Sequence, residues 1–406
     1  MPKQKIQYDF FADGGETGVA LKKKARKRKI INYIDKNGET ILAELAQALN
    51  ISPPTTSILV NELIAEGLIK DYGKVDSNGG RPASIYGLVA ESCFFIGVDV
   101  RQYYVNIGLL DFQKNLVKVN MKIPYLLENN QAALNKLIKL IKNFIKTAPV
   151  DTRKILALCI NLGGRIDTVR GISHSFFHFT QEPLVKILEE GIGVRCFIEN
   201  DSRAMAYGEF YKGKRKNERN VLFLNLDYGI GLGILVNGKM YYGRSGFSGE
   251  IGHVPFFNNE IICHCGKKGC FETEASGRAL IALFMDEVSK GVKTSVNTKK
   301  EIRLNDIIEA AIKEDMLSID SLAVIGEKIG RGAATLINIF NPEMVIIGGS
   351  LAATSEYIYL PIKSALNKFS ISIVNNDTKL VISELGEKAG VIGGGLIARN
   401  KLLRNS

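Results

Sequence analysis

Apolar residues follow two different spacings along this chain. From about residue 22 to residue 89 they recur at helical spacing in three short segments, at 25–38, 40–50 and 52–69, and two short strand-like stretches follow. Beyond residue 92, apolar runs of strand length alternate with longer helical segments. The change in spacing predicts a small domain of three helices and a hairpin, followed by a larger α/β domain.

The small domain has recognisable helix ends. The first helix stops at Gly38, Thr40 is a candidate cap of the second, and Ser52 followed by Pro53 begins the third. Two short helices before a third predict a helix-turn-helix, and the stretch "IKDYGKVDSNGGRPASIYGL" predicts a hairpin wing. A winged helix places its third helix in the major groove of DNA and its wing tip against the backbone or minor groove.

The leading edge of the third helix and the wing tip supply candidate DNA contacts. Thr55, Ser57 and Asn61 are expected to face bases or phosphates, and Arg81 is the minor-groove candidate. Lys27, in the basic run "LKKKARKRKI", is a candidate phosphate contact, although such a run also suits the solvated face of a helix. Small winged domains also bind proteins, so that alternative stays open.

The α/β part repeats its pattern. Three strands, a helix, a strand, a helix and a strand precede a second run that opens at "NVLFLNLD" and closes with a helix from about Gly390. Two such halves predict two lobes with a ligand-binding cleft. The predicted divisions are a mobile tail at 1–20, a winged helix-turn-helix domain at 21–91, and a domain at 92–406 with lobe 1 at about 92–199 plus 388–406 and lobe 2 at about 200–387.

Composition narrows the class of protein. Of 406 residues, 46% are hydrophobic and 23% are charged, which is typical of soluble globular proteins. No apolar run approaches the roughly 20 residues that span a bilayer, and the N-terminus lacks the apolar core of a signal peptide. We therefore predict a cytoplasmic protein with no membrane partner. The net charge of +11 is weak evidence for nucleic acid, because the cations are spread along the chain.

The stretch "GEIGHVPFFNNEIICHCGKKGCFE" carries the strongest chemical signal. His253, Cys263, Cys265 and Cys270 form the closed, soft set of four ligands that structural Zn²⁺ prefers. His264 is a competing ligand, and a patch of reduced thiols is the alternative to a metal. Four protein ligands leave no open position, so the metal is expected to build structure and not to activate water.

Carboxylates flank this motif. Zinc would hold Glu250 and Glu272 at fixed positions, as recognition of several hydroxyl groups requires. Asn200 and Asp201 stand where a strand ends and a helix begins, so Asp201 is either a ligand contact or a helix cap.

The stretch "LNLDYGIGLGILVNG" has the layout of a phosphate loop with unsuitable side chains. Asp227 and Tyr228 precede Gly229, where phosphates would require a hydroxyl group and no negative charge. Like charges a few ångströms apart cost on the order of 1 kcal/mol or more, so this loop should repel a triphosphate.

These motifs resemble those of the ROK family, the repressors and sugar kinases built on a two-lobed, actin-like (ribonuclease H-like) fold. The zinc motif, "SGEIGH", "END", "NPEMVIIGGSLA" and "GVIGGGLIA" match in order across nearly the whole chain. The resemblance implies that His253 touches both metal and sugar, and that Asp201 matches the base of the kinases. The ligand-binding residues it implies are Asn200, Asp201, Glu250, His253, Glu272 and, in "NLGGRID", Gly164.

The winged domain resembles the repressor branch of the family, and the phosphate loops depart from the kinase branch. Family kinases read Asp-hydrophobic-Gly-Gly-Thr after the first strand, whereas "DVRQY" keeps Asp99 but places Arg101 and Gln102 at the glycines. Kinases read Gly-Thr-Gly at the second loop, where Asp227 and Tyr228 stand. Arg101 alone could attract phosphate, so the two loops together predict the loss of ATP phosphoryl transfer.

We therefore predict a sugar-responsive transcriptional regulator, most simply a repressor, that binds operator DNA as a homodimer or homotetramer. Ile58 stands in the third helix where Arg or Lys is common in relatives, which changes the expected DNA preference. One alternative is an active ATP-dependent kinase for a hexose or N-acetylhexosamine that carries a DNA-binding head. Another is a regulator controlled by a protein partner.

Overall fold

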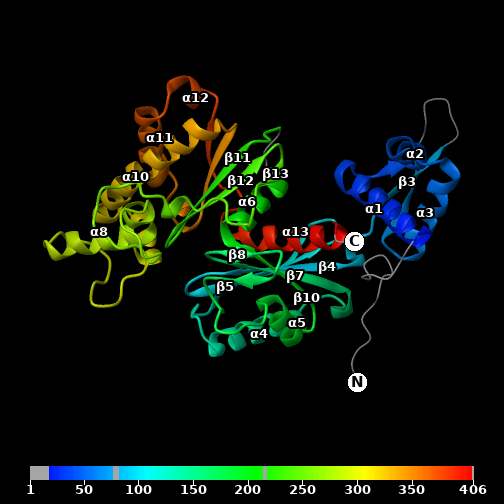
Figure 1. The fold of residues 1–406 in the computed structure, drawn as a ribbon, viewed down its shortest axis with the longest axis horizontal. Helices are drawn as coiled ribbons and strands as arrows, with labels where there is room; N and C mark the ends of the chain where they lie inside the picture. The colour runs from blue at the N-terminus through cyan, green and yellow to red at the C-terminus, as the bar shows by residue number, and fades with distance from the viewer. Residues whose placement is uncertain (1–17, 76–81, 214–216, 405–406) are drawn as a thin grey trace. The chain divides into compact units, whose positions relative to one another are not determined.

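A computed structural model describes residues 18–75, 82–213 and 217–404 (Figure 1). The chain divides into two compact units. Within the described ranges, no helix is both long enough and apolar enough to cross a membrane. Unit 1 comprises 1–160, 179–198 and 394–406, and unit 2 comprises 161–178 and 199–393. The division thus places 161–178 in unit 2, whereas the sequence pattern placed them in lobe 1.

The N-terminal part of unit 1 is a winged helix, as the sequence predicts. It contains α1 (Val19–Asn37), α2 (Leu42–Leu49), α3 (Pro53–Ala65) and a sheet in the order β1-β3-β2, formed by β1 (Thr40–Ile41), β2 (Ile69–Val75) and β3 (Ala83–Leu88). The prediction that Thr40 caps α2 is wrong. Thr40 belongs to the short strand β1, which precedes α2, and it pairs with Tyr86 of β3. Its hydroxyl group donates a hydrogen bond to Glu44.

The rest of unit 1 is built on a five-stranded sheet. Its order is β10-β7-β4-β5-β6, and β4 to β6 run antiparallel to their neighbours in sequence. Helices α4 and α5 cover one face (Figure 1). The bounds are β4 (Phe94–Val100), β5 (Tyr104–Asp111), β6 (Leu116–Pro124), α4 (Gln131–Lys146), β7 (Ile155–Leu162), α5 (Leu184–Ile192) and β10 (Arg195–Asn200).

Unit 2 is built on a second five-stranded sheet, in the order β13-β12-β11-β14-β15. Side chains of β11 alternate between its two faces: Leu222 and Leu224 pack in one cluster with α8 to α11, and Val221 and Phe223 pack in another with α6. Strand β11 is antiparallel to β12 and parallel to β14. The bounds are α6 (Asp201–Lys212), β11 (Val221–Leu226), β12 (Ile230–Val236), β13 (Lys239–Met240), α8 (Gly277–Ser289), α9 (Leu304–Ile312), α10 (Met316–Phe340), β14 (Met344–Gly348), α11 (Glu356–Phe369) and β15 (Lys379–Ile382).

Shorter elements and the last helix complete the chain. They are β8 (Ile166–Asp167), β9 (Ile172–Ser173), α7 (Glu272–Ala275), α12 (Ser372–Asn376) and α13 (Ala389–Arg404). The two similar halves predicted from the sequence are therefore confirmed as two sheets, each packed against helices. Asn200 and the residues Arg101 and Asp227 considered below lie where strands of these sheets end.

Candidate metal centre and ligand site

Four predicted ligands converge in unit 2. The ligand atoms of His253, Cys263, Cys265 and Cys270 all lie within 4.8 Å of one another. Cys263 Sγ is 3.5 Å from His253 Nδ1, and the sulfur atoms of Cys265 and Cys270 are 3.6 Å apart. Ligands about 2.0–2.3 Å from a tetrahedral Zn²⁺ lie roughly 3.5–3.8 Å from each other, so these four atoms fit a metal ion.

A second group, His253, His264 and Glu272, overlaps the first. Glu272 Oε1 lies 2.8 Å from His264 Nδ1 and accepts a hydrogen bond of 2.9 Å from Cys263 Sγ. Burial raises the pKa of Glu272, but the bonds from His264 and Cys263 outweigh it, so the pKa is lowered overall. Glu272 therefore lies beside the thiol cluster as an anion.

Glu250, on the same loop as His253, differs from Glu272 in having few partners. Its nearest ion-pair neighbour is His253 Nε2 at 3.9 Å, and among the described residues no group donates a hydrogen bond to its carboxylate. The side chain is 34% exposed. Burial is the main cause that raises the pKa of Glu250, the charges of His253, Arg203 and Arg165 lower it, and Asp201 adds to the rise.

The residues at the start of α6 are fixed by the loops around them. Asn200 is the N-cap of α6, accepting a bond of 3.1 Å from Arg203 N, and its Nδ2 donates to the Gly164 carbonyl at 3.0 Å. The cap that we considered for Asp201 is therefore made by Asn200. Asp201 Oδ2 accepts a bond of 3.3 Å from Asn225 Nδ2. Gly164 has φ +84°, and a Cβ there would lie 2.2 Å from Ser175 Oγ.

Sequence reasoning missed the buried pair behind these residues. Glu199 is fully buried, and its Oε1 accepts a bond of 2.8 Å from Arg203 Nε. Arg203 Nη1 also donates to the Gly246 carbonyl, and Tyr242 donates to Glu199 Oε2. A charged residue on each side of "ND" in "IENDSR" was the available signal. This pair sets the position of the helix start that carries Asn200.

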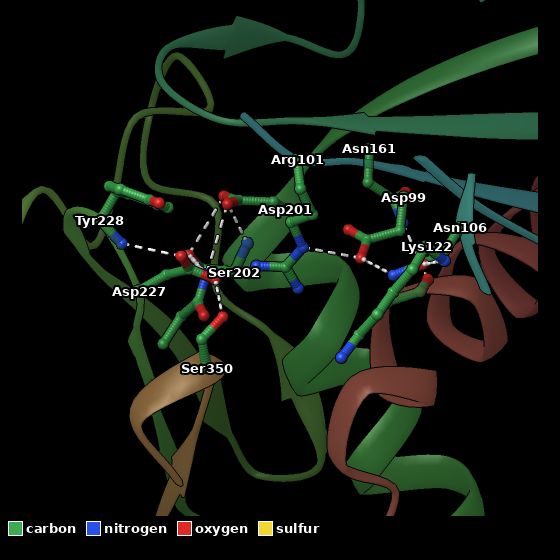
Figure 2. A network of polar contacts seen from close by, with 12 residues as sticks. Asp99, Arg101, Asn106, Lys122, Asn161, Asp201, Ser202, Asp227, Tyr228 and Ser350 are labelled. Atoms are coloured by element: carbon green, nitrogen blue, oxygen red, sulfur yellow. Dashed lines mark hydrogen bonds and ion pairs between the residues drawn. The ribbon is translucent and has the colours of Figure 1, made fainter. Parts of the chain in front are cut away.

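The charged side chain of the first phosphate loop, in unit 1, forms an ion pair within that unit. Arg101 is only 9% exposed, and its Nε donates to Asp99 Oδ2 at 2.8 Å (Figure 2). Asn106, paired with Asp99 across β4 and β5, donates to the same oxygen at 3.4 Å. Because the guanidinium group is buried against a carboxylate, it is not presented to an incoming phosphate.

The second phosphate loop, in unit 2, also turns its polar groups inward. The Asp227 carboxylate accepts bonds of 2.8 Å from Tyr228 N and from Ser350 Oγ (Figure 2). The Tyr228 hydroxyl group accepts a bond of 3.3 Å from Leu304 N at the start of α9. A Cβ at Gly229 would lie 3.1 Å from Glu272 Oε2, so the glycine leaves space for the Glu272 carboxylate.

The predicted DNA contacts are only partly presented. Asn61 is exposed on α3, and Thr55 and Ser57 are half-buried. Lys27 forms ion pairs of 2.8 Å with Glu62 and 2.5 Å with Glu66, and its side chain is 11% exposed. This pairing argues against the predicted phosphate contact at Lys27, because its charge is already neutralised. Arg81 lies outside the described residues.

Comparison with known proteins agrees with this geometry. The ROK family model matches residues 95–401, and a winged helix-turn-helix DNA-binding model matches residues 24–70. The chain is 30% identical to the xylose repressor of Caldicellulosiruptor bescii over 92% of this chain and 95% of the relative. It is 29% identical to the DNA-binding transcriptional dual regulator NagC of Escherichia coli over 95% of both chains.

Solved structures include both regulators and kinases. A ROK family transcriptional regulator, a homologue of the E. coli MLC protein, matches with a TM-score of 0.77 and 26% identity over 94% of this chain and 97% of that chain. A ROK family glucokinase from Streptomyces griseus, in complex with glucose and AMPPNP, matches with a TM-score of 0.67 and 26% identity over 76% of this chain and 99% of that chain. The second match covers less of this chain, as expected if the winged helix is an addition.

These matches confirm the two-lobed, actin-like fold with a winged helix before it. The ROK model covers well over half of the chain, and the regulator match extends over nearly all of it. The chain belongs to the ROK family.

Proposed function

We propose that this protein is a transcriptional regulator, most simply a repressor, that binds operator DNA through its winged helix and a sugar or sugar derivative through unit 2. The observation that supports the sugar site is the environment of the Glu250 carboxylate. Its carboxylate is partly buried beside a metal-ligand cluster, yet no described residue donates a hydrogen bond to it. An acceptor that folding leaves without a donor suits the hydroxyl groups of a sugar.

The proposed sugar contacts all belong to unit 2, and two of them, Asp201 and His253, interact with Glu250. Electrostatic interaction links Glu250 to Asp201, Arg203 and His253. Glu272 lies against the other side of the His253 ring, at 3.6 Å. The full proposed set is Gly164, Asn200, Asp201, Glu250, His253 and Glu272. We assign Asn200 and Gly164 mainly to positioning, because their side-chain and backbone groups bond to each other.

We propose that the metal is a structural Zn²⁺ held by His253, Cys263, Cys265 and Cys270. The spacing of the four ligand atoms supports this set, and a closed set of four leaves no coordination position for substrate water. The ion would neutralise thiolate charge and hold the loop between Glu250 and Glu272. That loop is the part of unit 2 in which both carboxylates must keep fixed positions.

The kinase alternative is not favoured. At each phosphate loop the charged side chain is engaged within its own unit: Arg101 with Asp99, and Asp227 with Tyr228 and Ser350. The Tyr228 amide, which already donates to the Asp227 carboxylate, is not available to a phosphate group. Asp201, which matches the kinase base, is then kept as a sugar contact.

We further propose that the protein acts as a homodimer or homotetramer on an inverted repeat, with half-sites about one helical turn apart or a multiple of it. Sugar binding would change operator affinity, and a factor of 5 to 150 corresponds to roughly 1–3 kcal/mol of coupling. The relatives are named for xylose and N-acetylglucosamine, so both sugars belong among the first ligands tested.

The test is a thermal-shift screen of the full chain against xylose, N-acetylglucosamine, glucose and their phosphates, each with and without Mg-ATP. A ligand at a hundred times its Kd should add about 2.7 kcal/mol of stability. We expect a shift with one class of sugar, none with ATP, and a lost shift in Glu250→Gln. A shift with ATP that sugar enlarges would contradict the proposal and restore the kinase.

A further inference from the structure

Helix α3 presents a large apolar side chain to solvent, whereas its other large apolar residues are buried or half-buried. Ile58 is 58% exposed, whereas Leu59, Val60 and Leu63 are at most 3% exposed. After Pro53, which is exposed at the first position of the helix, the exposed residues of α3 follow the helical spacing i, i+4, i+7 and i+11. We call this the outer face of α3, and its residues are Pro54, Ile58, Asn61 and Ala65.

The outer face carries no charged side chain, and the charges of α3 lie on its flank. Glu62 pairs with Lys23 at 2.6 Å and with Lys27 at 2.8 Å, and Glu66 pairs with Lys27. These ion pairs join α3 to α1 and neutralise the two carboxylates that would otherwise repel phosphates. The outer face can therefore approach DNA without bringing negative charge to it.

We infer that Ile58 reads thymine, by packing its side chain on the 5-methyl group in the major groove. This inference rests on the proposed DNA-binding function. In the major groove only thymine offers a methyl group, beside its O4 acceptor, so only thymine gives an isoleucine an apolar group of this size to pack against. An exposed Ile58 thus favours thymine over the other bases.

Asn61 extends the same argument by one turn. It lies three residues after Ile58 on the outer face, which corresponds to roughly 4.5 Å along the helix axis at 1.5 Å per residue. Successive base pairs are about 3.4 Å apart. An asparagine amide pairs with adenine N6 and N7. The outer face therefore fits a half-site in which a thymine and an adenine occupy neighbouring or next-neighbouring positions.

The experiment begins with DNA sequences that the protein itself selects. The full-length protein enriches duplexes from a random-sequence library, and the best duplex is resynthesised with one thymine at a time replaced by uracil. This replacement removes only the 5-methyl group. Affinities are measured for the wild-type protein, for Ile58→Ala, and for Ile373→Ala as a matched control, because Ile373 is 74% exposed on α12, outside the winged helix.

We expect uracil at the contacted position to weaken wild-type binding about fourfold, which is the value for a buried methyl group worth about 0.8 kcal/mol. Ile58→Ala should bind the thymine and uracil duplexes equally, and Ile373→Ala should behave as the wild type. Matching melting temperatures would show that Ile58→Ala is folded.

Two results would overturn the inference while leaving DNA binding in place. One is wild-type binding that ignores uracil at every position, and the other is an Ile58→Ala variant that keeps the full uracil sensitivity. If the wild-type protein enriches no sequence at all, the proposed DNA-binding function fails as well, and the exposed isoleucine would then suit a protein partner.

Discussion

Two carboxylates of unit 2, Glu250 and Asp227, lie beside glycine-containing loops and have opposite surroundings. The Asp227 carboxylate accepts bonds of 2.8 Å from Tyr228 N and Ser350 Oγ. No described residue donates a hydrogen bond to Glu250, and burial raises its pKa. The Asp227 carboxylate is bonded within the fold, whereas the Glu250 carboxylate is the one that we propose binds a ligand.

On the proposed function, the difference would explain how a kinase-like domain loses one substrate and keeps another. A phosphate loop needs amide donors that folding leaves available, whereas a sugar site also needs acceptors. Asp227 accepts a hydrogen bond from one amide of its own loop, Tyr228 N, whereas no described residue donates to Glu250. We therefore propose that the same unit recognises a sugar without recognising a nucleotide.

The largest effect should come from the buried ion pair of Glu199 and Arg203 at the start of α6. Arg203→Met would leave the fully buried Glu199 carboxylate without its positively charged partner, and we expect a loss of about 3–5 kcal/mol in the free energy of unfolding. Urea titration measures it. Arg170→Met is the matched control, because the Arg170 side chain is 65% exposed in its ion pair with Asp167 and should lose at most about 1 kcal/mol. Equal losses in both variants would contradict the scaffold role of Arg203.

The metal centre should give the next largest effect. Cys265→Ser removes one of four ligands, so we expect loss of bound zinc, a destabilisation of about 3 kcal/mol and a weaker response to sugar, because the loop that holds Glu250 loosens. His264→Ala distinguishes the two overlapping ligand sets, since it should keep zinc if Cys265 and Cys270 are ligands. Atomic absorption and thermal melting provide both readouts. Zinc lost from His264→Ala and kept by Cys265→Ser would reverse the assignment.

The sequence predicted the elements and motifs involved, but it did not predict the long-range partners of Asp227 and Lys27. Alternating strands and helices, the Cys-His motif and the altered loops were all readable, because each depends on local spacing. The partners of Asp227 were not, since Ser350 is 123 positions away in the chain and only the fold brings it near. For the same reason Lys27 looked like a phosphate contact until its pairing with Glu66 was visible.

A pair of charge-removing substitutions tests the contrast directly. Glu250 has a raised pKa, so its contribution to stability is present below the unfolded pKa and is lost as pH rises through the folded pKa. Because burial disfavours the charged carboxylate, Glu250→Gln at pH 7 should keep stability or raise it by less than about 0.5 kcal/mol, while sugar affinity falls at least about tenfold. Asp227→Asn should do the reverse, losing about 1–2 kcal/mol of stability with sugar affinity unchanged.

Urea titration at pH 7 and calorimetry with the sugar found in the screen measure both quantities. Asp227→Asn should also fail to bind Mg-ATP, because the Arg101–Asp99 pair remains at the other loop. If Asp227→Asn lost sugar binding and Glu250→Gln kept it, the two carboxylates would have been assigned to the wrong roles.

The smallest effect concerns Tyr228, the bulky residue of the second phosphate loop. Its hydroxyl group accepts a hydrogen bond of 3.3 Å from Leu304 N, one of the backbone donors that α9 leaves unsatisfied at its start. Tyr228→Phe should cost about 1 kcal/mol in urea titration and leave sugar and ATP binding as they were. That loss of stability would show that a position where kinases carry a phosphate-binding hydroxyl group supports the fold in this protein. A change in sugar affinity at constant stability would instead place this loop in the ligand site.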